Sequence, residues 1–181
     1  MAWLRWFSLG LLLGLSALGL WRRLDHGTGG IAADFVQQFD NASLRRPDPN
    51  VFAVRDVSIS GLSKPSITVQ QPSRIAWDLT VPGNAWVEAE LALQEEVWTL
   101  AGDGVLFRIG ISFDGRYDEL VTQVVNPFAL PDDRRWVPVA ADLSPYAGRA
   151  VSLIFNTRPG LEGDNRDNDL AVWGAPRVAT R

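Results

Sequence analysis

The chain of 181 residues is 46% hydrophobic and 21% charged, a composition typical of a globular domain with one sizeable core. It has no cysteine and one histidine, His26, which excludes disulfides, thiolate metal sites, thiol nucleophiles and multi-histidine metal sites within one chain. The net charge is −4, and residues 1–30 carry three arginines against one aspartate, so the acidic remainder argues against binding to nucleic acid.

Residues 2–21 form a long apolar run near the N-terminus. Twenty helical residues span about 30 Å, the thickness of a bilayer core. Arg5 can reach the headgroups, tryptophans lie near both ends, and Arg22-Arg23 ends the run. We therefore expect a membrane anchor over residues 1–24, with the acidic body outside the cytoplasm. The alternative is a secretory signal with its small-x-small cleavage site at Ala17-Leu18-Gly19.

Residues 25–50 are interpreted as a linker. Its first part, 25–30, is rich in glycine, and the prolines within 45–50 predict a loop. Between these parts, a short amphipathic helix is predicted by apolar residues at helical spacing, namely Ile31, Phe35, Val36 and Phe39.

Residues 51–181 carry strand signals at short spacing. The clearest is 105–113, where apolar residues alternate with a second set in the period of a half-buried strand, and Asp114-Gly115 then marks a hairpin. Alternation and turn residues predict further strands over 52–60, 67–69, 75–81, 87–93, 117–125, 136–143, 150–157 and 170–178. Eight or nine strands without a crossover helix predict an all-β fold, an antiparallel β-sandwich (jelly roll) preceded by an N-terminal transmembrane helix.

A series of short phrases in the second half of the body carries a family resemblance. The phrases are Trp136–Val139, Asp142-Leu143-Ser144, Tyr146–Arg149, Val151–Thr157 and Asp169–Pro176. In this order they resemble bacterial galactose-binding-like jelly-roll domains, which are similar to carbohydrate-binding modules. The resemblance covers about residues 50–180. It implies a sugar-binding sandwich of the kind that accompanies glycosyltransferases, glycosidases or sulfatases.

Four residues are the candidates for a sugar site. A pyranose stacks its apolar face on an aromatic ring, while polar side chains bond its hydroxyl groups. Trp98 lies in the loop predicted over 94–103, and Tyr117 follows the hairpin turn, so both are candidate stacking rings. Arg116 and Asn126 are the candidate polar partners. The alternative for each aromatic residue is packing in the core.

The acidic segment 164–169 is the candidate metal site. Asp164, Asp167 and Asp169 offer the oxygen ligands that calcium prefers, and jelly rolls of the resembled group often hold a structural calcium. The segment lacks the spacing of an EF-hand loop. The alternative is a solvated turn in which Asp169 caps backbone amides. No other cofactor is expected.

No set of residues predicts catalysis. Glu88 and Glu90 share one face of a predicted strand, and solvent-facing charges explain them better than the paired acids of a glycosidase. We therefore expect a membrane-anchored, non-catalytic module that binds carbohydrate and assists the handling of envelope polysaccharide. The alternatives are a structural or protein-interaction sandwich without a small ligand and, third, a glycosidase or esterase.

Overall fold

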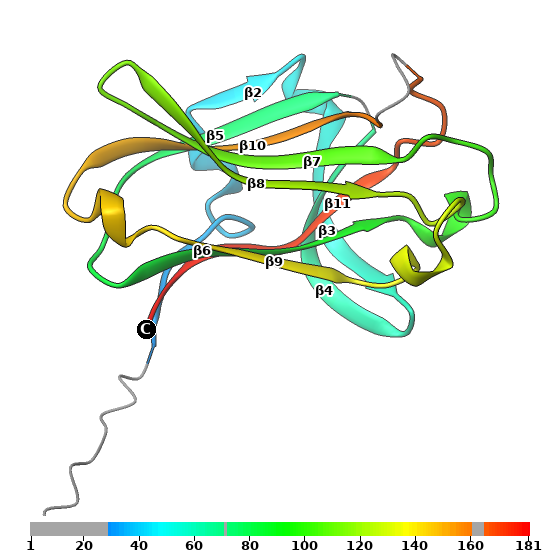
Figure 1. The fold of residues 1–181 in the computed structure, drawn as a ribbon, viewed down its shortest axis with the longest axis horizontal. Helices are drawn as coiled ribbons and strands as arrows, with labels where there is room; N and C mark the ends of the chain where they lie inside the picture. The colour runs from blue at the N-terminus through cyan, green and yellow to red at the C-terminus, as the bar shows by residue number, and fades with distance from the viewer. Residues whose placement is uncertain (1–28, 71, 161–164) are drawn as a thin grey trace, which may run out of the picture.

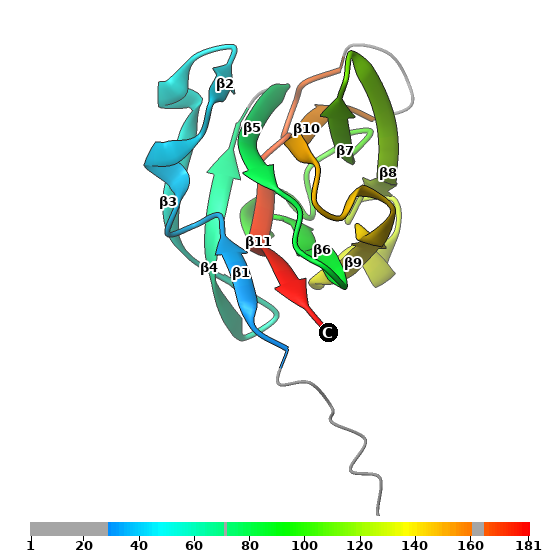
Figure 2. The ribbon, with the colours of Figure 1, turned by 90° about the vertical axis from the view of Figure 1, so that its left-hand side faces the viewer.

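The computed structural model describes residues 29–70, 72–160 and 165–181. In these ranges the chain folds into two antiparallel sheets that pack face to face (Figure 1, Figure 2), which confirms the predicted β-sandwich. The sheets contain eleven strands rather than eight or nine. No helix in the described ranges is long and apolar enough to cross a membrane, and the span predicted over 2–21 lies outside them.

The first sheet has the order β3-β4-β11-β6-β9, and β1 joins it beside β11. Its strands are β1 (Ile31–Asp34), β3 (Phe52–Ile59), β4 (Leu62–Val69), β6 (Ala85–Leu93), β9 (Val137–Asp142) and β11 (Ala171–Thr180). β4 pairs with the first half of β11 and β1 with the second half. The start of β1 therefore lies beside the C-terminal end of the chain (Figure 2).

The second sheet has the order β2-β5-β10-β7-β8. Its strands are β2 (Leu44–Arg46), β5 (Ser73–Thr80), β7 (Val105–Phe113), β8 (Arg116–Val125) and β10 (Ala150–Pro159). Both central neighbours of β10 are distant from it in sequence, so the sheet is held together by long-range pairing. Since side chains alternate between the faces of a strand, each strand sends one set into the core and one set outward.

The core between the sheets is dominated by aromatic rings in edge-to-face contact. Trp173 of β11 meets Phe155 of β10 and Phe107 of β7, with ring centroids 5.0 and 4.9 Å apart. All three side chains are at most 2% exposed. Edge-to-face contacts of this kind stabilise beyond the burial of area alone, and here they join the first sheet to the second.

The amphipathic helix predicted around residue 35 is wrong. Residues Ile31–Asp34 form β1, and the Asp34 carboxylate then accepts hydrogen bonds from two following backbone N–H groups at 3.0 and 3.1 Å, which closes a turn. The turn places Phe35 in the core, fully buried and stacked on Trp77 at 4.5 Å. The turn brings Phe35, Val36 and Phe39 to the core without a helix, whereas Ile31 is 59% exposed. Residues 44–46, predicted as linker and loop, pair with β5 as β2.

Candidate functional site

An open groove crosses the outer face of the second sheet. Its volume is about 740 Å³, and each of the five strands of the sheet contributes side chains to it. Binding sites for small molecules commonly have volumes of about 300–1,000 Å³. In Figure 1 this sheet is the upper layer. Arg74 and Arg108 of the lining alternate with buried neighbours, which places the groove on the outer face of the sheet. A second cavity, on the first sheet beside Glu88 and Glu90, is smaller, with a volume of about 290 Å³.

A row of polar side chains crosses the groove from strand to strand. The register of the sheet places Arg46 opposite Arg74, Arg74 opposite Asn156, and Asn156 opposite Arg108. The Arg74 Nε donates a hydrogen bond to Asn156 Oδ1 at 2.8 Å. Neighbouring strands lie about 4.8 Å apart, so these four residues extend over about 14 Å. Because one row comes from four strands, the rigid sheet fixes the spacing of its hydrogen-bonding groups.

The next row of the sheet forms a smooth floor. Here Ala76 lies opposite Ile154, and Ile154 lies opposite Gly110, so no polar side chain stands in this row on these three strands. Gly110 has no side chain because the ring of Tyr117 occupies that space. A Cβ atom at Gly110 would lie 2.2 Å from the Tyr117 Oη and 2.4 Å from its ring. Tyr117 therefore rests over the glycine.

Tyr117 presents an aromatic surface to the groove. Tyr117 is 47% exposed, although its ring rests over Gly110. Partial burial, with the charge of Glu119 as a smaller cause, raises the pKa of the hydroxyl above its ordinary value of 10. The hydroxyl is therefore protonated at neutral pH, and it can both donate and accept a hydrogen bond. An exposed ring, a floor without polar groups and a polar row together match the demands of a sugar ring.

The structure does not bring the four predicted sugar-site residues together. Tyr117 lines the groove, whereas Arg116 lies at the hairpin end of β8 opposite Phe113, outside the groove lining. Asn126 follows the other end of β8, about 30 Å away at about 3.3 Å per residue. Its side chain accepts a hydrogen bond from the N–H of Ala129 at 3.1 Å and donates one to a loop carbonyl, so it joins two loops.

Trp98 belongs to a small apolar cluster on the outer face of the first sheet. It packs against Trp136 and its buried neighbours, and its Nε1 donates a hydrogen bond to the Leu93 carbonyl at 2.9 Å. Trp136 covers Gly174, where an added Cβ would lie 2.5 Å from the ring. The two tryptophans thus form a satellite core on the sheet opposite to the groove.

The predicted calcium segment contains a buried and unsatisfied carboxylate. Asp169 is 5% exposed, and its Oδ1 has no hydrogen-bond partner among the described residues. Neither carboxylate oxygen of Asp103 has a partner there. Burial, followed by the charges of Asp103 and Asp167, raises the pKa of Asp169 to about 7. This repulsion identifies Asp103 as a neighbour that was not predicted from the sequence.

The donors in this cluster suit a hard cation, since unpartnered carboxylate oxygens are what calcium binds. Asp167 is exposed, and Asp164 lies outside the described residues. Within the described part of the chain, no group of three or more acidic or histidine side chains is close enough to hold a metal. The depression lined by Asp169 encloses almost no free volume, about 0 Å³, so an organic substrate cannot enter it.

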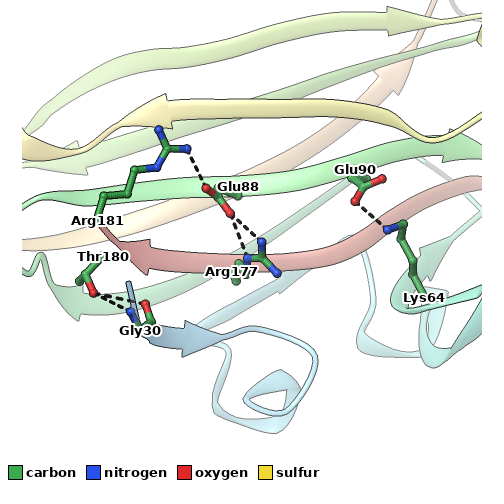
Figure 3. Close-up of polar contacts among 7 residues, drawn as sticks. All are labelled: Gly30, Lys64, Glu88, Glu90, Arg177, Thr180 and Arg181. Carbon is green, nitrogen blue, oxygen red and sulfur yellow. Dashed lines mark hydrogen bonds and ion pairs between the residues drawn. The ribbon is translucent and has the colours of Figure 1, made fainter. Parts of the chain in front are cut away.

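Glu88 and Glu90 are both held by cations on the outer face of the first sheet (Figure 3). Glu88 accepts hydrogen bonds from Arg177 at 2.8 and 3.0 Å and from Arg181 at 2.9 Å, and the Lys64 Nζ lies 2.8 Å from Glu90. The hydrogen bond from Arg181, with Arg177, holds the pKa of Glu88 below its usual range, although burial opposes this. A general acid in glycoside hydrolysis needs a raised pKa, so Glu88 has the opposite property.

Carbohydrate-binding modules are among the solved structures with a similar fold. A CBM51 from Clostridium perfringens GH95, solved in complex with methyl-galactose, matches at a TM-score of 0.55 and 12% identity, over 81% of this chain and 98% of that one. A second match is a structure of the M60 catalytic domain with the CBM51-1 and CBM51-2 domains from Clostridium perfringens ZmpB, with a TM-score of 0.51 and 14% sequence identity. The match covers 77% of this chain and 14% of that chain. These likenesses confirm the carbohydrate-binding-module fold that the sequence resemblance predicted.

Similarity in sequence is narrower than similarity in fold. No protein-family model matches the chain. A protein of Archaeoglobus fulgidus, described as an uncharacterized protein, is 41% identical over 103 residues, which is 56% of this chain. The chain spans about a quarter of that relative's length, 25%. This relative therefore supports a shared domain and says nothing of its ligand.

Most of the groove was not predicted from the sequence. Arg74, Arg108 and Asn156 each alternate with buried neighbours, so their outward direction could be inferred from the sequence. Their meeting in one row depends on the pairing of β5, β10 and β7, which are far apart along the chain. Only the hairpin that places Tyr117 beside β7 was visible as a local signal.

Proposed function

We propose that this chain binds carbohydrate in the groove on the outer face of the second sheet. The observation that carries the proposal is the exposed Tyr117 ring beside a floor without polar groups and next to the row Arg46, Arg74, Asn156 and Arg108. The ring would stack on the apolar face of a pyranose, and the row would bond its hydroxyl groups. The methyl-galactose complex of a module with the same fold supports this class of ligand.

We further propose that residues 2–21 tether the module to a membrane, with the sandwich outside the cytoplasm, where it would hold envelope polysaccharide. The support is the length and apolarity of that run and its flanking arginines. β1 is the first strand after residues 2–21, and it pairs with β11 in the first sheet. The groove lies on the other sheet. A tether that enters through the first sheet would leave the groove on the second sheet accessible to a long polymer.

A non-catalytic role is part of this proposal. The groove lining contains no carboxylate, whereas glycoside hydrolysis generally uses two. Among the acids with altered pKa values, Glu88 and Asp142 have lowered values, and Asp169, whose value is raised, is enclosed without substrate space. Binding without turnover is therefore the activity that the described residues support best.

Glycan-array or polysaccharide pull-down binding by the full chain tests the proposal. Tyr117→Ala should weaken binding about 30-fold, because truncating a central aromatic residue typically costs about 2 kcal/mol. Phe128→Ala is the matched control, since Phe128 is 46% exposed but lies outside the groove lining. Silence over a broad glycan panel, or equal loss in both variants, would reject the groove as a glycan site.

We also propose a structural calcium ion bound by Asp169 with Asp103, and with Asp164 and Asp167 from the same segment. The buried, unpartnered oxygens of Asp103 and Asp169 support it. The ion would offset their repulsion and fix the loops before β7 and β11. Calcium should raise the melting temperature of the full chain, and chelator should lower it. An unchanged melting temperature under both conditions would reject the calcium site.

The alternative function is a protein-interaction module. It is favoured by three exposed apolar side chains on loops after β6 and β8, namely Leu100, Phe128 and Leu130. This alternative predicts a co-purifying protein whose binding is lost in Phe128→Ala and retained in Tyr117→Ala, the reverse of the result that the glycan groove predicts.

A further inference from the structure

We propose that the groove selects glycans that carry anionic groups, either hexuronate carboxylates or sulfate esters. This inference rests on the proposed function and names its substrate class. The first observation is the composition of the groove lining. It contains no acidic residue and four arginines, namely Arg46, Arg74, Arg108 and Arg158. The chain as a whole carries −4, so the lining is positive against the overall balance, although Asp78 and Glu119 lie on the same face of the sheet outside the lining.

The second observation is that the arginines face one another. Arg46 and Arg74 are direct cross-strand partners on one face, an arrangement in which like charges repel. Arg74 donates to Asn156, a neutral acceptor, and Arg46 has no carboxylate partner among the described residues. A sheet that needed these positions only for solubility could carry either sign of charge. An anionic ligand between them would turn the repulsion into attraction.

The third observation concerns Arg108, at the other end of the row. Its Nε lies 3.3 Å from a Glu119 carboxylate oxygen, but this buried Nε makes no hydrogen bond within the ranges that the structure describes. The side chain is two-thirds buried, so its charge is only partly screened by water. Glu119 therefore pairs with Arg108, and Arg46 and Arg74 are left to an incoming group.

Guanidinium groups match carboxylate and sulfate better than they match hydroxyl groups. Their planar N–H forks bind two oxygens at once, and hydrogen bonds to a charged acceptor are about twice as strong as neutral ones. Arg46 and Arg74 lie opposite each other on neighbouring strands, about 4.8 Å apart, so both forks can engage one charged group of an oligosaccharide. Tyr117 would meet a ring of the same oligosaccharide on its apolar face.

Binding by the full chain, held in a polyoxyethylene detergent whose headgroup contains no sugar, tests the inference. The probes are two matched pairs: oligogalacturonides against galacto-oligosaccharides, and dextran sulfate against dextran. We expect one anionic member to bind at least tenfold more tightly than its neutral counterpart and to weaken as salt is added. The pair that shows the preference distinguishes carboxylate from sulfate.

Arg46→Gln and Arg74→Gln should each weaken binding of the preferred anionic probe about tenfold or more. Binding of the neutral member should fall by a clearly smaller factor, because glutamine keeps hydrogen-bonding groups for hydroxyls but loses the positive charge. Arg45→Gln is the matched control. It removes the same charge from the same strand, but Arg45 pairs with the buried Ile75 row and stacks on Phe39 at 4.9 Å, away from the groove. Unchanged melting temperatures verify that the variants fold.

Equal affinity for the charged and neutral members would overturn this inference and leave the glycan groove intact. The absence of binding to any of the four probes and to a broad glycan array would overturn the proposed function itself. Displacement of the anionic glycan by single-stranded RNA or by phosphatidylserine vesicles at equal charge would also overturn the inference, because the groove would then be a general polyanion site.

Discussion

Replacing Asp169 with asparagine should stabilise the protein at alkaline pH in the absence of calcium. In the folded state Asp169 is 5% exposed, its Oδ1 has no hydrogen-bond partner among the described residues, and its pKa is raised to about 7. Its ordinary value is 3.8, so the two dissociation constants differ by about three powers of ten, which corresponds to roughly 4 kcal/mol. The asparagine side chain would keep the shape of the aspartate without its charge.

The sign follows from proton binding. Between pH 4 and pH 7 the folded state holds a proton on Asp169 that the unfolded state has released. The contribution of this group to the free energy of unfolding is therefore fully present below about pH 4 and is lost as the pH rises through about 7. Asp169→Asn removes this loss. The stability of the variant relative to the wild type should therefore rise by about 2 to 3 kcal/mol between pH 5 and pH 8.

Urea denaturation of the full chain in chelator, at pH 5 and at pH 8, measures the difference. Asp132→Asn is the control, because Asp132 is exposed and its carboxylate makes no hydrogen bond or ion pair within the described residues. It should leave the stability nearly unchanged at both pH values. An Asp169→Asn protein that is less stable than the wild type at pH 8, or that keeps the same pH dependence, would refute the reasoning.

Two further changes test the groove and the satellite core. Gly110→Ala places a Cβ atom 2.2 Å from the Tyr117 hydroxyl, so it should displace the ring and weaken glycan binding about tenfold. The control is Gly83→Ala, because a Cβ atom there meets nothing within 4 Å. Unchanged glycan affinity in Gly110→Ala would show that Tyr117 does not contribute to binding. Trp98→Ala should lower the free energy of unfolding by about 3 kcal/mol, measured by urea denaturation, because Trp98 packs in the satellite core. Its glycan affinity, measured by titration, should not change. Loss of glycan binding in a Trp98→Ala protein that remains stable would show that Trp98 contacts the ligand.

The strands were largely predictable because their signals are local. Alternation over 105–113 gives a strand whose residues 107, 109 and 111 are buried, as the structure shows. The turn Asp114-Gly115 has φ values of 47° and 72°, which fits the turn that an Asp-Gly pair predicts in a two-residue hairpin. Period and turn chemistry therefore identify the strands of the sandwich body before any contact is known.

The edge segments were not predictable in the same way. Phe35 and its neighbours have helical spacing, yet pairing with β11 and the turn closed by Asp34 determine their conformation. Tertiary pairing here overrides a local periodicity of only a few residues. β2 is three residues long and precedes a proline, so nothing local distinguishes it from a loop.

The site was less predictable than the fold. Tyr117 was recognised from its place beside a hairpin, but the arginine row comes from strands that are consecutive in the sheet and scattered in the chain. Asp103 was likewise missed, because its effect on Asp169 links two loops about 65 residues apart. Both features depend on register, which composition and spacing within one segment do not reveal.

The most direct test of the central claim is a residue-resolved NMR titration of the full chain with galacto-oligosaccharides and oligogalacturonides. If the outer face of the second sheet binds glycans, the perturbed backbone amides should be those of Arg74, Gly110, Tyr117 and Asn156, with loops 98–103 and 126–135 unaffected. Perturbations confined to those loops, or none with any oligosaccharide, would contradict the account.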